Sequence, residues 1–457
     1  MWPEDLLPAI QRENAQKPAS IVVLDDDPTG TQTVYDVPVV TNWDLSTMVD
    51  EFERGKPLFY VLTNSRSLSK AQAVDLAEDA GSKILEASER TGRAFEVISR
   101  SDSTLRGHFP AEVDSLANVL GMETAVRLIV PFFEEGGRYT INDIHYVKEA
   151  EQLIPAAETP FAGDVVFGYA NSDLKYWVEE KTKGRLAAES VQSLSLEEIR
   201  VKGPDYIAQR LADCRPGSAC IVNAAAYRDI EVVTLAMLRA QREGRRFLAR
   251  TAASFVRIRA GLAGRSLLTA DEMNCKEEAA GLIVVGSHVP RSCEQLEHVL
   301  RYTSAQSVEV DVETILSPTD RGRCIQEAAK AVENGLTQGE DVVVHTSRKL
   351  VTGNDEESSL RIGAQVSEAL VQLVRSVRTR PRYILAKGGI TSSDTATKAL
   401  EIVRADVLGQ ILPGVPVWRA GAESRFPALA YIIFPGNVGK AESITQIVQG
   451  FREPANS

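Results

Sequence analysis

The stretch 21–33 constrains the fold of this chain more than any other. Residues 21–24 are apolar and mostly β-branched, the pattern of a strand buried on both faces of a parallel sheet. Residues 25–27 are three consecutive aspartates, and Pro28 and Gly30 then predict a turn. The carboxylates therefore stand where ligands bind in open α/β sheets. They either hold a cation or a hydroxyl, or form an ordinary loop with an aspartate helix cap.

Alternating strands and helices predict a mostly parallel sheet in the first half of the chain. Apolar runs at 57–63, 94–99 and 125–130 read as strands, and residues 70–91 have helical spacing. Because parallel strands end at one edge of their sheet, the polar residues after the strands should line a single crevice. Those residues are Asp25, Asp26, Asp27, Arg66, Arg100, Ser101, Asp102, Ser103 and Thr104.

The stretch 139–185 is less regular. Residues 139–146 and 167–173 combine Tyr, Asn and Asp, and we expect a hairpin and a lid over the crevice there. The lone His145 is expected to be a hydrogen-bonded structural residue. The segment 257–280 mixes Gly, Arg, Glu and Ala, and we place a junction there, between domains 1–256 and 281–457.

A second α/β pattern occupies residues 281–457. Its apolar runs at 281–285, 341–344, 383–386 and 431–434 predict strands. Three of them end in turns rich in glycine: Gly286-Ser287, Gly388-Gly389-Ile390-Thr391 and Pro435-Gly436-Asn437-Val438-Gly439. Turns that lead from a strand into a helix can receive phosphates on their backbone N–H groups. No Walker A motif and no G-x-G-x-x-G fingerprint occurs.

Composition excludes several classes of protein. The net charge of −12 over 457 residues, with no basic stripe, argues against a nucleic-acid partner. The five cysteines are scattered without a C-x-x-C pair, which predicts free thiols in a reducing cytoplasm. The amino terminus lacks the basic and apolar regions of a signal peptide, and no apolar run is long enough to span a membrane.

Five motifs in this order resemble the four-carbon acid sugar kinase family over nearly the whole chain, from about Ile21 to Val448. They are Asp26-Asp27-Pro28-Thr29-Gly30, Arg100-Ser101-Asp102-Ser103-Thr104-Leu105-Arg106-Gly107, Gly286-Ser287, Gly388-Gly389-Ile390-Thr391 and Pro435-Gly436-Asn437-Val438-Gly439. The chain departs from the family pattern at Asp25, where many members have a small residue.

The resemblance implies two α/β domains, each a mostly parallel sheet flanked by helices, with the active site in the cleft between them. The amino-terminal domain would bind a four-carbon sugar acid such as threonate, erythronate or 3-oxo-tetronate. The carboxyl-terminal domain would bind ATP, and a terminal hydroxyl would be phosphorylated. Carried over, the acid contacts are Asp26, Arg66 and residues 100–104. The nucleotide contacts are Ser287, Gly388, Gly389, Ile390, Thr391, Gly436, Asn437 and Val438.

Phosphoryl transfer needs positioning, charge neutralisation and a carboxylate that takes the hydroxyl proton. We expect Asp26 in that role, then Asp27, then Asp102. Arg66 and Arg100 would hold the substrate carboxylate or, alternatively, bind neighbouring carboxylates and hold the loops. Mg²⁺ is expected with ATP, with its protein ligands unknown. A nicotinamide-dependent sugar-acid oxidoreductase and a non-catalytic sugar-acid sensor remain alternatives, and a homodimer remains open.

Overall fold

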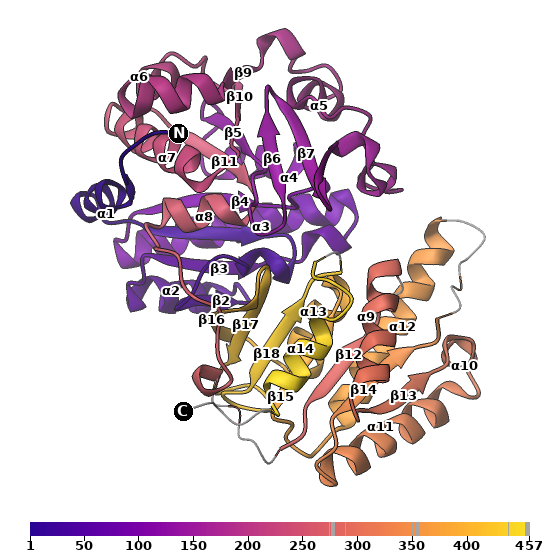
Figure 1. The fold of residues 1–457 in the computed structure, drawn as a ribbon. Helices are drawn as coiled ribbons and strands as arrows, with labels where there is room; N and C mark the ends of the chain where they lie inside the picture. The colour runs from indigo at the N-terminus through magenta and orange to yellow at the C-terminus, as the bar shows by residue number, and fades with distance from the viewer. Residues whose placement is uncertain are drawn as a thin grey trace. The chain divides into compact units, whose positions relative to one another are not determined.

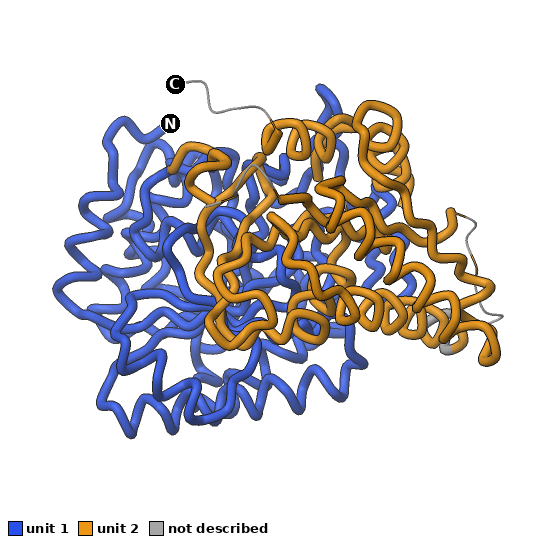
Figure 2. Tube along the Cα trace, turned by 90° about the horizontal axis from the view of Figure 1, so that it is seen from below, with its two compact units in different colours: residues 1–264 blue, residues 265–457 orange. Residues whose placement is uncertain are grey.

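The computed structural model describes residues 1–273, 275, 279–287, 289–348, 351, 356–436 and 438–452. The chain divides into two compact units, Met1–Gly264 and Arg265–Ser457 (Figure 2). This division falls inside the stretch 257–280. Both units are α/β with mostly parallel sheets, so the predicted fold class is confirmed. No helix among the described residues is long and apolar enough to cross a membrane.

The sheet of the first unit has the strand order β2-β3-β1-β4-β11-β5-β10-β9 (Figure 1). Every neighbouring pair in it is parallel. Its strands are β1 (Ser20–Asp25), β2 (Val37–Val40), β3 (Leu58–Leu62), β4 (Phe95–Arg100), β5 (Val126–Val130), β9 (Gln192–Leu194), β10 (Ala219–Val222) and β11 (Phe247–Thr251).

Eight α-helices are described for this unit: α1 (Leu7–Gln16), α2 (Leu45–Arg54), α3 (Lys70–Thr91), α4 (Ala111–Val119), α5 (Leu174–Lys181), α6 (Gly203–Ala212), α7 (Tyr227–Arg242) and α8 (Ala253–Arg259). Helices α2, α3 and α4 pack on one face of the sheet, against alternate residues such as Val22 and Leu24. Ile21 and Val23 point the other way and are buried too, so both faces of β1 are covered as its apolar sequence predicts.

The predicted hairpin is present. Strands β6 (Arg138–Ile141) and β7 (Ile144–Glu149) are antiparallel, and β8 (Gln152–Pro155) completes a small three-stranded sheet. His145 is fully buried in this hairpin. Its Nε2–H donates to the carbonyl of Ser103 at 2.7 Å, and its Nδ1 accepts from the Thr140 hydroxyl at 3.0 Å. The expectation of a structural histidine is therefore confirmed.

The sheet of the second unit has the order β13-β14-β12-β15-β18-β17-β16, in which only β17 is antiparallel to its neighbours. Its strands are β12 (Leu282–Val285), β13 (Gln306–Val310), β14 (Val342–Thr346), β15 (Tyr383–Lys387), β16 (Arg404–Leu412), β17 (Val415–Ala420) and β18 (Ala430–Phe434). Its helices are α9 (Pro290–Tyr302), α10 (Val312–Leu316), α11 (Arg321–Thr337), α12 (Glu356–Ser376), α13 (Gly389–Asp394) and α14 (Ser443–Gly450).

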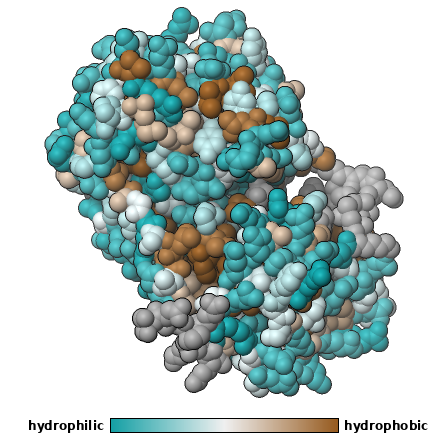
Figure 3. Space-filling model, in the orientation of Figure 1, coloured by the Kyte–Doolittle hydropathy of each residue, from teal (hydrophilic) through white to brown (hydrophobic). Residues whose placement is uncertain are grey.

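Each parallel sheet reverses its strand order at a strand that ends in a predicted site loop. In the first unit the chain builds β3 on one side of β1 and then places β4 on the other. In the second unit β14 and β15 flank β12 in the same way. Such switch points are where ligands bind in open α/β sheets. The visible surface around these sheets is mostly hydrophilic, with hydrophobic residues in small groups (Figure 3).

Candidate functional site

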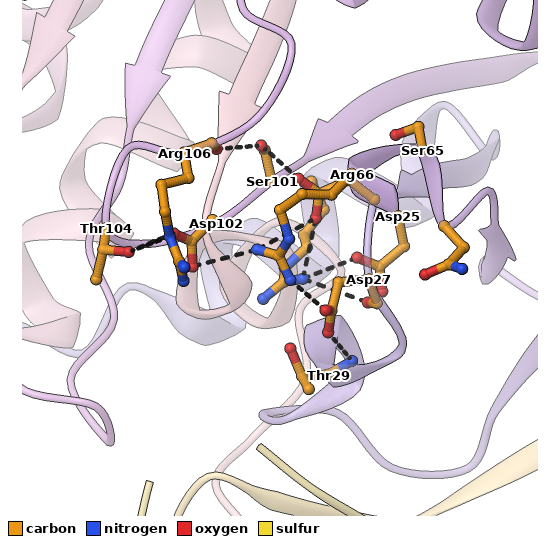
Figure 4. Close-up of polar contacts among 12 residues, drawn as sticks. Asp25, Asp27, Thr29, Ser65, Arg66, Ser101, Asp102, Thr104 and Arg106 are labelled. Carbon is orange, nitrogen blue, oxygen red and sulfur yellow. Dashed lines mark hydrogen bonds and ion pairs between the residues drawn. The ribbon is translucent and has the colours of Figure 1, made fainter. Parts of the chain in front are cut away.

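The loops after β1, β3 and β4 meet at the switch point of the first unit and join their side chains in one ion-pair network (Figure 4). Asp25 and Arg100 occupy partner positions on neighbouring strands, and their side chains form an ion pair at 2.9 Å. The structure thus brings together the acidic and basic residues that the sequence placed at one sheet edge.

Arg66 lies at the centre of the network, between two carboxylates (Figure 4). One terminal nitrogen contacts Asp27, and the other lies 3.3 Å from Asp102 Oδ1. Arg100 pairs with Asp25. Both predicted substrate-binding arginines therefore already have carboxylate partners within the protein, as the loop-holding alternative expects.

Asp25 is enclosed by its surroundings. Only 1% of the residue is exposed, and burial raises the pKa of its carboxyl to about 7 despite the adjacent Arg100. A Cβ added at Gly30 would lie 2.0 Å from Asp25 Oδ2. Residue 30 is therefore a glycine because the Asp25 carboxylate occupies the place of a side chain.

Asp27 and Asp102 have all the partners that an ionised carboxylate needs. Asp27 Oδ1 accepts from the Thr29 N–H at 2.8 Å and caps the short 3₁₀ turn Pro28–Thr31. Burial would raise the pKa of Asp27, but Arg66 and Arg100 hold it below its ordinary value. Burial likewise opposes ionisation of Asp102, yet Arg106 and Arg66 lower its pKa strongly. Both carboxylates therefore act as ion-pair partners of neighbouring arginines.

Asp26 differs from these three aspartates. Its Oδ2 accepts from the Ser101 hydroxyl at 2.8 Å. Its Oδ1 is buried and has no hydrogen-bond partner among the described residues. The nearest guanidinium nitrogens, of Arg100 and Arg66, lie 3.6 and 4.0 Å from that oxygen. One oxygen is thus fixed in place while the other can still accept a hydrogen bond.

The loop that carries residues 101–106 is held by groups that the sequence did not single out. Arg250, on β11, donates to the Ser101 hydroxyl at 3.2 Å and to the Arg106 carbonyl at 2.9 Å. The Tyr169 hydroxyl donates to the Thr104 carbonyl at 2.8 Å. The sequence signal for Arg250 is a charged residue within the short run Phe-Leu-Ala-Arg-Thr, which forms the fully buried strand Phe247–Thr251.

The predicted nucleotide residues gather at the switch point of the second unit. Gly388 has a φ of +108°, and a Cβ added there would lie 3.1 Å from Ser287 Cβ. A Cβ at Gly436 would lie 4.0 Å from Ser287 Oγ. Lys387 Nζ donates to the carbonyls of Pro435 and Gly436 at 2.5 and 3.2 Å, which joins the loops after β15 and β18.

Four of the five remaining predicted nucleotide contacts belong to the described residues. Gly389, Ile390 and Thr391 begin α13, and the Ile390 side chain is exposed. Val438 accepts a hydrogen bond from Gln295 through its carbonyl. Asn437 lies outside the described residues. The three loops therefore converge, and the charged side chains of Lys387 and Arg348 donate to their backbone carbonyls.

Each of the two units matches the model of a known protein domain. Residues 21–259 match the model of a sugar-binding N-terminal domain, and residues 282–444 match that of a nucleotide-binding C-terminal domain. A search of curated proteins found no match.

Solved structures share the fold. A Salmonella typhimurium LT2 protein, provisionally described as a tRNA synthase, is 15% identical with a TM-score of 0.66, over 94% of this chain and 98% of its own. A Haemophilus influenzae protein of the DUF1537 family is 16% identical with a TM-score of 0.60, over 94% and 100%. The two matched domain models are those of one family, so the chain belongs to the four-carbon acid sugar kinase family.

Proposed function

We propose that the protein is an ATP-dependent kinase that phosphorylates a terminal hydroxyl of a four-carbon sugar acid of the threonate, erythronate or 3-oxo-tetronate type. The pairing of a sugar-binding with a nucleotide-binding domain supports this reaction. The observation that carries the proposal is Asp26, a buried carboxylate at the switch point with one oxygen unpartnered among the described residues.

Asp26 has the arrangement that a proton acceptor needs. The acceptor hydroxyl loses its proton during phosphoryl transfer, and a carboxylate within hydrogen-bond reach can take it. The Ser101 hydroxyl fixes Oδ2 and so leaves Oδ1 for the substrate. Asp27 and Asp102 hold Arg66 in place beside Asp26, and Asp25 does the same for Arg100.

The second unit fits a nucleotide through its backbone. The positive φ of Gly388 and its closeness to Ser287 create a surface that a Cβ would fill, which suits close approach of phosphates. In the described part of the chain, no group of three or more His, Cys, Asp or Glu side chains could hold a metal ion. We therefore expect Mg²⁺ to be held mainly by the phosphates of ATP, where it neutralises charge during transfer.

A coupled assay of ADP release tests the proposal. The wild-type protein with ATP and Mg²⁺ is screened against threonates, erythronates, 3-oxo-tetronates and pentonates, with the corresponding neutral polyols as controls. We expect turnover with at least one four-carbon acid and none with the polyols. Parallel absorbance assays with NAD test the oxidoreductase alternative. Reduction of NAD by an acid, or acid binding without either reaction, would contradict the kinase proposal.

A further inference from the structure

Arg138 differs from the other arginines around the site because, in the described part of the chain, its guanidinium makes neither a hydrogen bond nor an ion pair; Arg250 also lacks an ion pair but donates two hydrogen bonds. It is the first residue of β6, and both of its backbone hydrogen bonds go to Phe133, at 2.8 and 3.0 Å. Only 6% of the residue is exposed. Among the described residues, its guanidinium takes part in no hydrogen bond and no ion pair within 4 Å, and its Nε is buried without a partner. No group among the described residues therefore accepts a hydrogen bond from the guanidinium of Arg138.

The surroundings of Arg138 connect it to the ion-pair network. Its guanidinium carbon lies 5.8 Å from the centre of the Phe161 ring, and that of Arg106 lies 5.1 Å from the same ring. Arg106 in turn donates to Asp102 at 2.8 Å. The charged groups that act on Arg138 are Asp102, Arg106 and Glu149, with Tyr169 beside them. Arg138 thus extends the site beyond Arg106.

A buried guanidinium without a counter-ion is unfavourable in a folded protein, because its lost hydration is not replaced. Burial accordingly lowers the pKa of Arg138. The nearby Arg66 and Arg100 differ, since the carboxylates of Asp25, Asp27 and Asp102 already accompany them. An entering acid would have to compete with those carboxylates, whereas Arg138 offers unoccupied donors.

We propose that Arg138 forms an anion subsite of this unit and binds the carboxylate of the sugar acid. The planar fork of a guanidinium matches a carboxylate with two parallel hydrogen bonds. The Phe161 ring lies beside the guanidinium groups of both Arg138 and Arg106. This inference rests on the proposed function for the identity of the ligand, but the unpaired charge that motivates it does not depend on phosphoryl transfer.

Calorimetric titration of wild-type protein and Arg138→Met with the best acid of the screen, its neutral polyol and inorganic phosphate tests the subsite. We expect the variant to lose roughly 30-fold or more in affinity for the acid, the usual loss when one partner of a buried charge pair is removed. Binding of the polyol should stay unchanged. Arg138→Lys should recover part of the acid affinity, because it restores the charge without the fork.

Melting curves without ligand separate recognition from a structural role. Arg138→Met should melt at or above the temperature of the wild type, since it removes an uncompensated buried charge. The matched control is Arg127→Met, near the amino end of β5, whose buried arginine pairs with Asp114 at 3.2 Å. It should melt at a lower temperature yet keep the wild-type KM for the acid.

The outcomes distinguish the two proposals. If the wild type turns over an acid and Arg138→Met does so with unchanged KM, the subsite is refuted and the kinase function stands. The subsite is also refuted if the variant loses phosphate binding but not acid binding, or loses acid affinity together with its fold. If the wild type binds acids through Arg138 but releases no ADP with any of them, the kinase proposal fails and the subsite stands.

Discussion

At the scale of single residues, Asp26 has a carboxylate oxygen that no described residue occupies and that can accept a hydrogen bond from a substrate. We expect Asp26→Asn to reduce kcat by about 10²–10⁴, the usual contribution of a positioned general base. The amide keeps the shape of the side chain and an oxygen for Ser101, so stability and ATP affinity should change little. Steady-state kinetics and calorimetric titration with ATP on the purified variant provide the measurement. Turnover close to the wild-type value would remove Asp26 from the mechanism.

A second prediction concerns the effect of Gly30→Ala on the free energy of unfolding. Gly30→Ala places a methyl group 2.0 Å from Asp25 Oδ2 and so must displace that carboxylate from Arg100. Overpacking and disruption of a buried pair together should cost about 2–5 kcal/mol in the free energy of unfolding, measured with urea. Gly163→Ala is the control, because no atom lies within 4 Å of its added Cβ. Equal stability of the two variants would contradict the tight enclosure of Asp25.

The sequence predicted which charged residues lie at the site, but it did not predict which arginine pairs with which aspartate. The motifs indicated which side chains share the sheet edge. They could not show that Arg66 and Arg100 are already paired, because Asp25 and Arg100 are 75 positions apart and meet only through the register of β1 and β4. The unpaired Arg138 was equally hidden, since nothing in its neighbouring sequence shows which charges surround it in the fold.

At the scale of elements, the β6–β7 hairpin supports the loop after β4 through one buried histidine. Burial lowers the pKa of His145 to about 4, against the opposing effect of its hydrogen bond to Ser103. Arg138, Arg250 and Asp102 are the charged groups nearby. Because the pKa is lower in the folded state, the unfolded state binds more protons between about pH 4 and 6.5. Stability is therefore present above pH 6.5 and is lost as the pH falls towards 4.

We expect this single group to remove on the order of 3 kcal/mol from the free energy of unfolding over that range. Urea denaturation of the wild type and of His145→Gln at several pH values measures the effect. The variant, which cannot titrate there, should be less stable at pH 8 but should lose less stability on acidification. If the free energy of unfolding fell with pH by the same amount in both proteins, protonation of His145 would not be the cause of the loss of stability.

Strands formed by continuous apolar runs were predictable, including β5 and β14, whereas short strands and strands of mixed sequence were not. The apolar runs before the site loops correspond to β1, β3, β4, β12, β15 and β18. Strand β2 was missed because it has four residues and contains Pro38, which argues against a strand in sequence. Strands β16 and β17 form an antiparallel pair around Gly414, and their sequences mix polar and apolar residues. Their formation depends on packing within the second unit.

At the scale of the whole molecule, both units place their glycine-rich or acidic loops at a reversal of strand order. This arrangement follows from a general rule of α/β sheets, which explains why the sequence pattern alone predicted that these loops would meet within each unit. The same rule assigns different chemistry to the two units. The first has a network of aspartates and arginines at its switch point, whereas the second has Gly388, Ser287 and Gly436, with Lys387 donating to the backbone carbonyls of Pro435 and Gly436. Binding of acid and of nucleotide should therefore be separable by mutation.

Gly388→Ala tests that separation. The φ of +108° is unfavourable for alanine, and the added Cβ would lie 3.1 Å from Ser287 Cβ, so the loops after β12 and β15 must move apart. We expect ATP affinity to fall by roughly tenfold or more, since strain of this kind costs about 1–3 kcal/mol. Acid affinity should remain at the wild-type value, because the proposed acid contacts lie in the first unit.

Calorimetric titration with each ligand measures both affinities, and Gly322→Ala is the control within the same unit. Gly322 lies in α11, with no atom within 4 Å of an added Cβ, so this substitution should leave both affinities unchanged. Unchanged ATP affinity in a folded Gly388→Ala protein would move the nucleotide site away from the switch point of the second unit. Loss of acid affinity in that variant would show instead that the two units do not bind their ligands independently.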